Sequence, residues 1–230
     1  MSADLNSDFS MPASAHTEDM EWVLSPSSGV WRKRLELVGG AETGRVTSVV
    51  RYDPGASFPI HDHPGGEEIL VLDGIFSDEH GDYPKGTFML NPEGFRHAPF
   101  SREGCVLFVK LRQFAGNNRR HVNIPTQNMD WAAGPTPGVS MKELYNQADY
   151  PEHIYITRLD PDTVVPHHEH PTGREAFFLE GEAEDEFGRY KKGSWVRLPP
   201  GSSHGLVTKT GATLYVKANG LGDLASTDDF

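Results

Sequence analysis

Short stretches of alternating or β-branched residues, separated by turn residues, run along most of the 230-residue chain. Residues 30–37 alternate apolar and polar positions, and residues 45–52 are rich in β-branched side chains, which are both strand patterns. Residues 68–72, 87–90 and 106–112 predict further strands. No long window shows the 3.6-residue period of a helix, so we predict an all-β protein.

The second half of the chain repeats the first. His61 and His97 have counterparts at His168 and His204, in both cases 107 positions later, and near the start of the chain the offset becomes 109. A repeat this long, built of many short strands, predicts two tandem β-barrel domains. We expect four segments: a flexible N-terminal arm that could instead add a strand to a neighbour (residues 1–20), an N-terminal domain (21–115), a C-terminal domain (116–222) and a tail (223–230).

The composition excludes several classes of partner. The formal net charge is -12, which disfavours nucleic acids and anionic membranes. No apolar run could span a bilayer, and residues 1–21 lack a signal-peptide pattern, so we expect a cytoplasmic protein. Cys105 is the single cysteine, so no intrachain disulfide forms; its apolar surroundings predict a core residue.

The main candidate for chemistry is the segment His61-Asp62-His63-Pro64-Gly65-Gly66-Glu67, together with His97. Two histidines separated by one residue share a face of a strand, and a glycine turn brings Glu67 back beside them. Three neutral nitrogens and one carboxylate suit iron or zinc, and also manganese or nickel, whereas calcium prefers oxygen ligands. We therefore predict one metal site held by His61, His63, Glu67 and His97, in preference to surface histidines in a polar turn.

The second copy keeps three histidines but loses the carboxylate. His168, His170 and His204 repeat the ligand pattern, whereas Arg174 stands where Glu67 would be. Three interpretations stay open: a three-histidine metal site, a site completed by Glu175 bulging inward, or a copy without metal that serves packing. A guanidinium beside a dication would repel it, which favours the last interpretation.

The glycine and proline spacing around these ligands resembles the two motifs of the cupin superfamily. Gly55 and Gly74 flank the first ligand segment at the spacing G-x5-H-x-H-x3-E-x6-G. The later segment reads G-x5-P-x-G-x2-H from Gly86 to His97, with Ser101 where the family usually has Asn. This resemblance implies two double-stranded β-helix (jelly-roll) barrels, that is, a bicupin with its intact metal site in the N-terminal barrel.

Two longer stretches of sequence point to a particular group within this superfamily. The segment His-Pro-Gly-Gly-Glu-Glu-Ile-Leu-Val-Leu-Asp-Gly and residues 104–114 resemble ChrR-like cupins, the C-terminal half of ChrR anti-sigma factors, and the related acetylacetone-cleaving dioxygenases. ChrR-type factors begin with a helical, zinc-binding domain that contacts the sigma factor. The first twenty residues here hold no Cys and only His16, so we do not expect sigma-factor binding by that route.

Two functions follow from these expectations. The first is a non-haem metal-dependent dioxygenase that cleaves a small dicarbonyl-type substrate; the second is a ligand- or oxidant-sensing regulatory module. A purely structural metal is a third reading. Glu68, Arg96 and Tyr83 are weak candidates for supporting residues, with surface or core-edge roles favoured, and no catalytic side chain is assigned. We also expect that the chain can form a homodimer.

Overall fold

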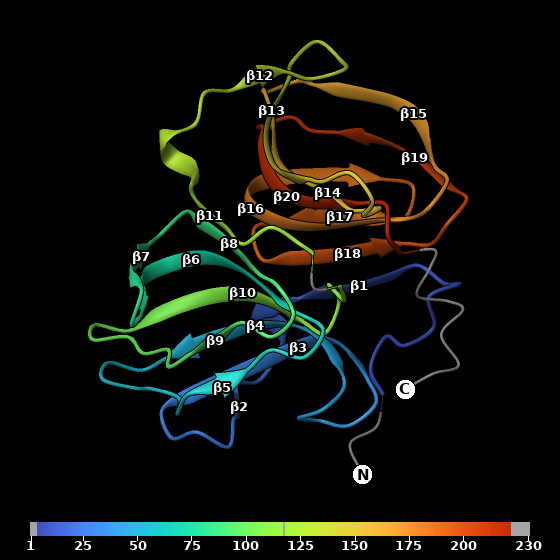
Figure 1. Cartoon of the computed structure of the whole chain (residues 1–230). Helices are drawn as coiled ribbons and strands as arrows, with labels where there is room; N and C mark the ends of the chain where they lie inside the picture. Colours follow the sequence, from blue (N-terminus) through green and yellow to red (C-terminus); the bar gives the residue numbers. More distant parts are fainter. Residues whose placement is uncertain (1–3, 117, 222–230) are drawn as a thin grey trace. The chain divides into compact units, whose positions relative to one another are not determined.

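The computed structural model describes residues 4–116 and 118–221, and its regular secondary structure is almost entirely β-strand (Figure 1). The chain divides into two compact units: Met1–Ser7 with Met20–Met129, and Asp8–Asp19 with Asp130–Phe230. The prediction of an all-β protein with two tandem barrels is confirmed. The predicted tail, residues 223–230, lies outside the described residues. No helix in the described ranges is long and apolar enough to cross a membrane.

The first unit is a sheet of eight strands in the order β11-β8-β6-β10-β4-β3-β2, with β7 beside β6, and a separate pair β5-β9. Its elements are β2 (Val23–Leu24), β3 (Val30–Val38), β4 (Arg45–Tyr52), β5 (His61–Asp62), β6 (Glu67–Asp78), β7 (Gly81–Pro84), β8 (Thr87–Asn91), β9 (Arg96–His97), β10 (Cys105–Leu111), β11 (Val122–Pro125) and the 3-10 helix η2 (Thr126–Asn128).

The second unit repeats this arrangement in the order β1-β18-β16-β20-β14-β13-β12, with β15, β17 and β19 attached at the side. Its elements are β1 (Ala13–His16), the 3-10 helix η1 (Thr17–Asp19), β12 (Ala132–Ala133), β13 (Val139–Asn146), β14 (His153–Leu159), β15 (Val164–His170), β16 (Arg174–Asp185), β17 (Gly188–Lys191), β18 (Ser194–Leu198), β19 (Ser202–Val207) and β20 (Ala212–Ala218).

The edge strand of each sheet comes from a part of the chain that leads into the other repeat. These edge strands are β11 in the first unit and β1 in the second. β11 leads into the second repeat yet pairs with β8 of the first unit, Val122 opposite Leu90. β1 leads into the first repeat yet pairs with β18 of the second unit, Ala13 opposite Arg197. Part of the segment expected to be a flexible arm is therefore a sheet strand, because the edge of β18 offers backbone hydrogen-bond partners.

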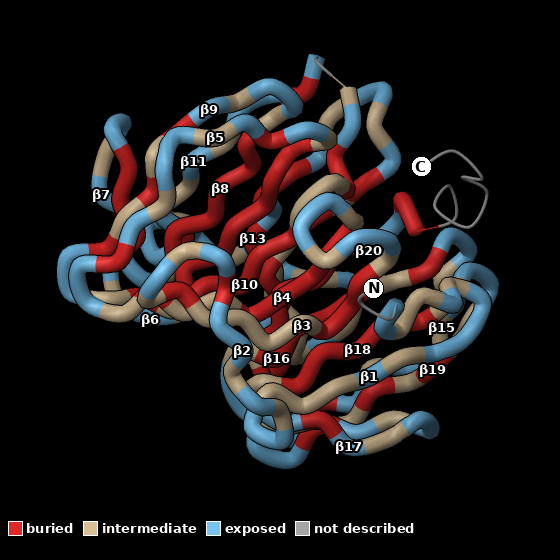
Figure 2. Tube along the Cα trace, turned by 90° about the horizontal axis from the view of Figure 1, so that it is seen from below, coloured by how far each residue is buried: buried red, intermediate tan, exposed pale blue. Residues whose placement is uncertain are grey.

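The core of the first unit is formed by side chains of its central strands. Of these strands, β8 and β10 are mostly buried (Figure 2). Buried residues from β4, β6, β8 and β10 form one apolar cluster, and Cys105 belongs to it, in agreement with its predicted role. The second unit has an equivalent cluster on β14, β16, β18 and β20. Side chains alternate between the two faces of each strand, so every second residue of these strands points into its barrel.

Candidate metal centre

The strand pair β5-β9 brings the predicted histidines together. His61 and His97 lie directly opposite each other in this antiparallel pair, and His63 follows β5 by one residue. Each of the three imidazoles offers one nitrogen, and these nitrogens all lie within 4.8 Å of one another. His63 and His97 are buried, whereas His61 is partly accessible.

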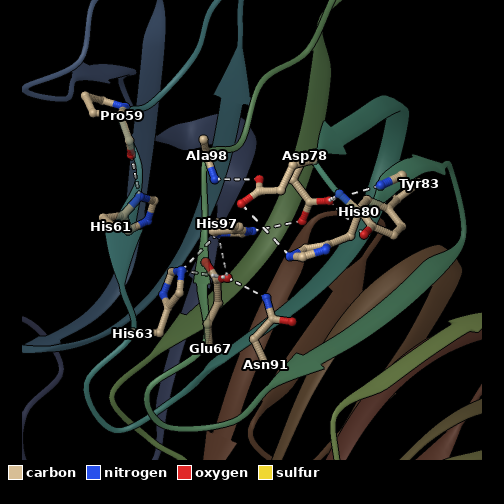
Figure 3. Close-up of polar contacts among 12 residues, drawn as sticks. Pro59, His61, His63, Glu67, Asp78, His80, Tyr83, Asn91, His97 and Ala98 are labelled. Atoms are coloured by element: carbon tan, nitrogen blue, oxygen red, sulfur yellow. Dashed lines mark hydrogen bonds and ion pairs between the residues drawn. The ribbon is translucent and has the colours of Figure 1, made fainter.

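Glu67, the first residue of β6, joins this group from a different strand. Its Oε2 lies 3.4 Å from Nε2 of His63 and 3.5 Å from Nε2 of His97, and these two nitrogens are 2.9 Å apart (Figure 3). Ligand atoms that lie about 2.1 Å from one metal ion, at angles of about 90–109°, are about 3.0–3.4 Å apart. The spacing of these donor atoms therefore fits a single ion between them.

Hydrogen bonds fix which nitrogen is free in two of the three imidazoles, those of His61 and His97. The carbonyl of Pro59 lies 2.9 Å from Nδ1 of His61, and a carboxylate oxygen of Asp78 lies 3.1 Å from Nδ1 of His97. Both oxygens only accept hydrogen bonds, so Nδ1 carries the proton in each ring and Nε2 keeps its lone pair. That is the tautomer a metal ion needs.

Asp78 is itself held tightly at the end of β6. One of its oxygens accepts hydrogen bonds from the backbone N–H of His80 and Gly81 and from the hydroxyl of Tyr83, and the other faces His97. Although burial raises the pKa of Asp78, these hydrogen bonds lower it overall, so the carboxylate stays ionised. Carboxylate–histidine pairs of this kind orient imidazoles at metal sites.

The buried environment also tunes the ligand side chains. Burial lowers the pKa of His63, although Glu67 opposes the shift. For His97, burial is outweighed by Asp78 and by the charge of Glu67, so its pKa is raised. Asn91 donates a 2.9 Å hydrogen bond to Oε2 of Glu67 and so holds the carboxylate in place.

Two glycines explain how the chain returns to Glu67. Gly65 and Gly66 both have positive φ, of 68° and 72°. A Cβ on Gly66 would lie 2.9 Å from Cβ of Phe114, and one on Gly65 would lie 3.1 Å from Cα of Arg112. Only glycine fits this turn, which packs against the segment following β10 and places Glu67 beside the histidines.

A cavity of about 300 Å³ opens from the ligand group into the first barrel. His61, His63 and Glu67 lie in its wall. The apolar part of the wall comes mostly from residues of neighbouring strands, namely Tyr52, Ile69, Phe76, Leu107 and Val109. Phe58, from the loop between β4 and β5, completes it. A small molecule in this cavity would therefore contact both the ligand group and an apolar surface.

The second unit contains the same histidine arrangement with a different fourth residue. The ligand nitrogens of His168, His170 and His204 lie within 4.8 Å of one another. Arg174 pairs with Leu198 and Ala218 in the sheet, which is the register that Glu67 has with its own neighbours. The sequence prediction that Arg174 takes the place of Glu67 thus agrees with the strand pairing.

Arg174 changes the electrostatics of this second group. Its Nη1 lies 3.5 Å from Nε2 of His168. Burial and the charge of Arg174 lower the pKa of His170 to about 3 and also lower the pKa of His168. Glu175 pairs instead with Trp195, whose indole N–H donates to it, so its carboxylate is engaged away from the histidines. The cavity beside His204 and Arg174 measures only about 20 Å³.

The weaker candidates from the sequence take other places. Tyr83 supports Asp78, whereas Arg96 is exposed and forms a 2.7 Å ion pair with Asp62. Glu68 is buried one residue beyond Glu67, and adjacent residues of a strand point to opposite faces. Sequence reasoning did not find Asp78 as a partner of His97, although the repeat of Asp78-Glu79 at Asp185-Glu186 marks the position.

Comparison with known proteins agrees with this architecture. The family model of the ChrR cupin-like domain matches the chain twice, over residues 10–115 and 119–221. The chain belongs to the ChrR cupin-like family. The two barrels are thus tandem cupins, and each contains a group of three histidines that could hold a metal ion. A comparison with curated protein sequences returns no match.

Several solved structures share the cupin fold at low sequence identity. A presumed dioxygenase from Nostoc punctiforme is 15% identical, with a TM-score of 0.71 over 96% of this chain and 83% of that one. Escherichia coli pirin YhhW, solved with nickel(II), is 11% identical, with a TM-score of 0.67 over 91% and 99%. Oxalate decarboxylase from Lactobacillus farciminis is 12% identical, with a TM-score of 0.64 over 90% and 86%. These similarities establish the fold alone.

Proposed function

We propose that the N-terminal cupin binds one divalent metal ion, iron or zinc before manganese or nickel, and that with iron bound it is a dioxygenase for small dicarbonyl-type compounds. The proposed ligands are His61, His63, Glu67 and His97. The observation that carries the proposal is the junction of this ligand group with a cavity of about 300 Å³. A site that only stabilised the barrel would need no such space. The presumed dioxygenase among the structural neighbours supports the same reaction class.

The bound ion would supply Lewis acidity and access to dioxygen, and the chain supplies the setting. Asp78 keeps Nε2 of His97 free, and Asn91 fixes Glu67. Burial and the charge of Glu67 raise the pKa of Tyr52 well above its usual value, so its phenol stays protonated and can donate a hydrogen bond to a substrate oxygen.

The first test is elemental analysis of the purified protein, metal by metal, for wild type, His97→Ala and the matched variant His204→Ala. We expect about one metal ion per wild-type chain, its loss in His97→Ala and its retention in His204→Ala. Oxygen uptake would then be measured with a series of dicarbonyl compounds. A wild-type protein without metal would refute the site, and an iron-loaded protein that consumes no oxygen with any of them would refute the dioxygenase assignment.

A second candidate is a regulatory sensor whose metal centre binds a ligand or an oxidised compound. The match to the ChrR cupin-like family model favours this alternative. A partner protein retained only by the oxidised or ligand-bound form would support it. A homodimer also stays a prediction, to be checked by light scattering.

A further inference from the structure

The cavity of the first barrel contains three arginines in addition to the proposed metal ligands. Arg32 and Arg34 are two residues apart on β3, so they share a face, and they lie opposite Val50 and Ser48 of β4. Arg112 follows the end of β10. All three arginines contribute to the cavity wall that also contains His61, His63 and Glu67.

The negative charge nearby offsets only part of this positive charge. Glu42 accepts from Arg32 at 2.8 Å and from Arg34 at 3.2 Å. Nε of Arg34 is buried and has no hydrogen-bond partner among the described residues. Arg112 reaches the carbonyl of Gly44 at 3.5 Å. Glu42 thus pairs with Arg32 and Arg34, whereas Arg112 has no ion pair with a carboxylate among the described residues.

Partial burial makes this excess of charge costly. Desolvation lowers the pKa of both Arg34 and Arg112. A buried cation is stable only where an anion or several hydrogen-bond acceptors compensate for lost water. Guanidinium groups present parallel N–H donors that match the two oxygens of a carboxylate. An incoming carboxylate would supply the missing acceptor.

The second repeat shows that the fold does not require these arginines. The positions of Arg32 and Arg34 are taken there by Met141 and Glu143, which pair with β14 in the same register. Asn219 occupies the position of Arg112, also with positive φ.

The space for a ligand is absent as well. Tyr155 stands where Ser48 lines the first cavity, and it packs against the second core cluster. The cavity there measures about 20 Å³ instead of about 300 Å³. The first repeat therefore has the three arginines, the large cavity and the carboxylate of Glu67. The second repeat lacks all three features.

We propose that the first cavity binds a small organic anion whose carboxylate contacts Arg32, Arg34 and Arg112. Its other end, a carbonyl or enolate oxygen, faces His61, His63 and Glu67. This inference rests on the proposed function and narrows its substrate class from dicarbonyl compounds to oxo acids. A neutral diketone of the same size has no carboxylate to accept hydrogen bonds from the arginines.

The test compares acetoacetate with acetylacetone, which has a methyl group in place of the carboxylate oxygen anion. Both are titrated calorimetrically, without oxygen, into the metal-loaded protein and into chelator-treated protein. We expect acetoacetate to bind at least about tenfold more tightly than acetylacetone, because charge-assisted hydrogen bonds add to its affinity. This preference should weaken as salt is added.

Variants assign the preference to the arginines. Arg34→Gln and Arg112→Gln should each weaken acetoacetate binding by about tenfold and leave acetylacetone unchanged. Glu42→Gln should strengthen acetoacetate binding. Arg51→Gln is the matched control, because Arg51 lies on β4 outside the cavity wall, against Trp22 and Trp31, and it should change neither. Circular dichroism checks that each variant folds.

The outcomes separate this inference from the proposed function. Equal affinities for the two probes, no acetoacetate binding, or a loss as large in Arg51→Gln as in Arg34→Gln would overturn the anion site, whatever the metal content. Arginine-dependent acetoacetate binding to a protein that takes up no metal would support the anion site and refute the metal centre. Arginine-dependent binding that also tightens with metal would support both.

Discussion

Asp78 offers the sharpest test of how the chain prepares the metal centre. In Asp78→Asn, one oxygen can still accept from the backbone N–H of His80 and Gly81 and from Tyr83. The new amide nitrogen then faces Nδ1 of His97, donor against donor, across the present 3.1 Å contact. His97 can relieve this clash by moving its proton to Nε2, which removes the lone pair that the metal needs.

The expected magnitude follows from this tautomer change. Losing the supporting carboxylate of a metal-bound histidine typically reduces metal affinity by about 10–100-fold, or about 1.4–2.7 kcal/mol. If the amide flips instead, its N–H groups face the backbone N–H donors of His80 and Gly81, and Tyr83 loses the acceptor of its hydroxyl. A buried hydrogen-bond mismatch of that kind costs about 1–3 kcal/mol of folding stability. Metal affinity is measured by competition with a chromophoric chelator, and stability by urea unfolding of the metal-free protein.

The second repeat supplies a matched control. Asp185 makes the same contacts, with the backbone N–H of Phe187 and Gly188, the hydroxyl of Tyr190, and Nδ1 of His204 at 2.8 Å. Asp185→Asn should therefore lower stability by a similar amount but leave metal affinity unchanged. Wild-type metal affinity in Asp78→Asn, or an equal loss of affinity in both variants, would refute the reasoning.

Four further predictions address other parts of the molecule. Arg174→Glu should raise the metal content from about one to about two ions per chain by elemental analysis, because three histidines are already in position; an unchanged content would mean that the small cavity excludes the ion. Ser48→Tyr should fill the first cavity, because the equivalent Tyr155 packs against the core of the second barrel. Calorimetry should then show no dicarbonyl binding while the metal content is kept; unaltered binding would place the ligand elsewhere. Burial raises the pKa of Cys105 to about 11, so this thiol should resist iodoacetamide at about pH 8 in the folded protein and react fully in urea. In the folded protein its reaction should speed up only as the pH approaches about 11; rapid labelling at about pH 8 would contradict its buried position. Deleting residues 1–19 should speed hydrogen exchange in β18 and leave β8 protected, since β1 pairs with β18 alone; equal protection in both would show that β1 contributes nothing to its sheet.

The sequence predicted correctly those features that depend only on the spacing of residues along the chain. His61 and His63 share a strand face by period, and the repeated offset of 107 places Arg174 at the position of Glu67. The strand predictions at 30–37 and 45–52 match β3 and β4 within one residue. These features depend on local pattern, which a single sequence preserves.

Features that depend on contacts between distant strands were not predictable in this way. Asp78 reaches His97 across nineteen positions because β6 and β9 converge, and no local pattern encodes that meeting. The arginines of β3 read as ordinary polar positions of an alternating strand until the cavity is known. Likewise, nothing in residues 1–20 indicates that β1 completes the sheet of a repeat that begins more than a hundred residues later.

The pairing of β1 and β11 means that the repeating unit of the sequence and the folding unit of the structure are out of phase. A fragment cut at the family boundaries, residues 10–115, would carry β1 without its partner strand and would present β8 without β11. Two such fragments could complete each other only by exchanging their arms. A duplicated single barrel with this connectivity would therefore have begun as an obligate pair, and gene fusion would have made that exchange intramolecular.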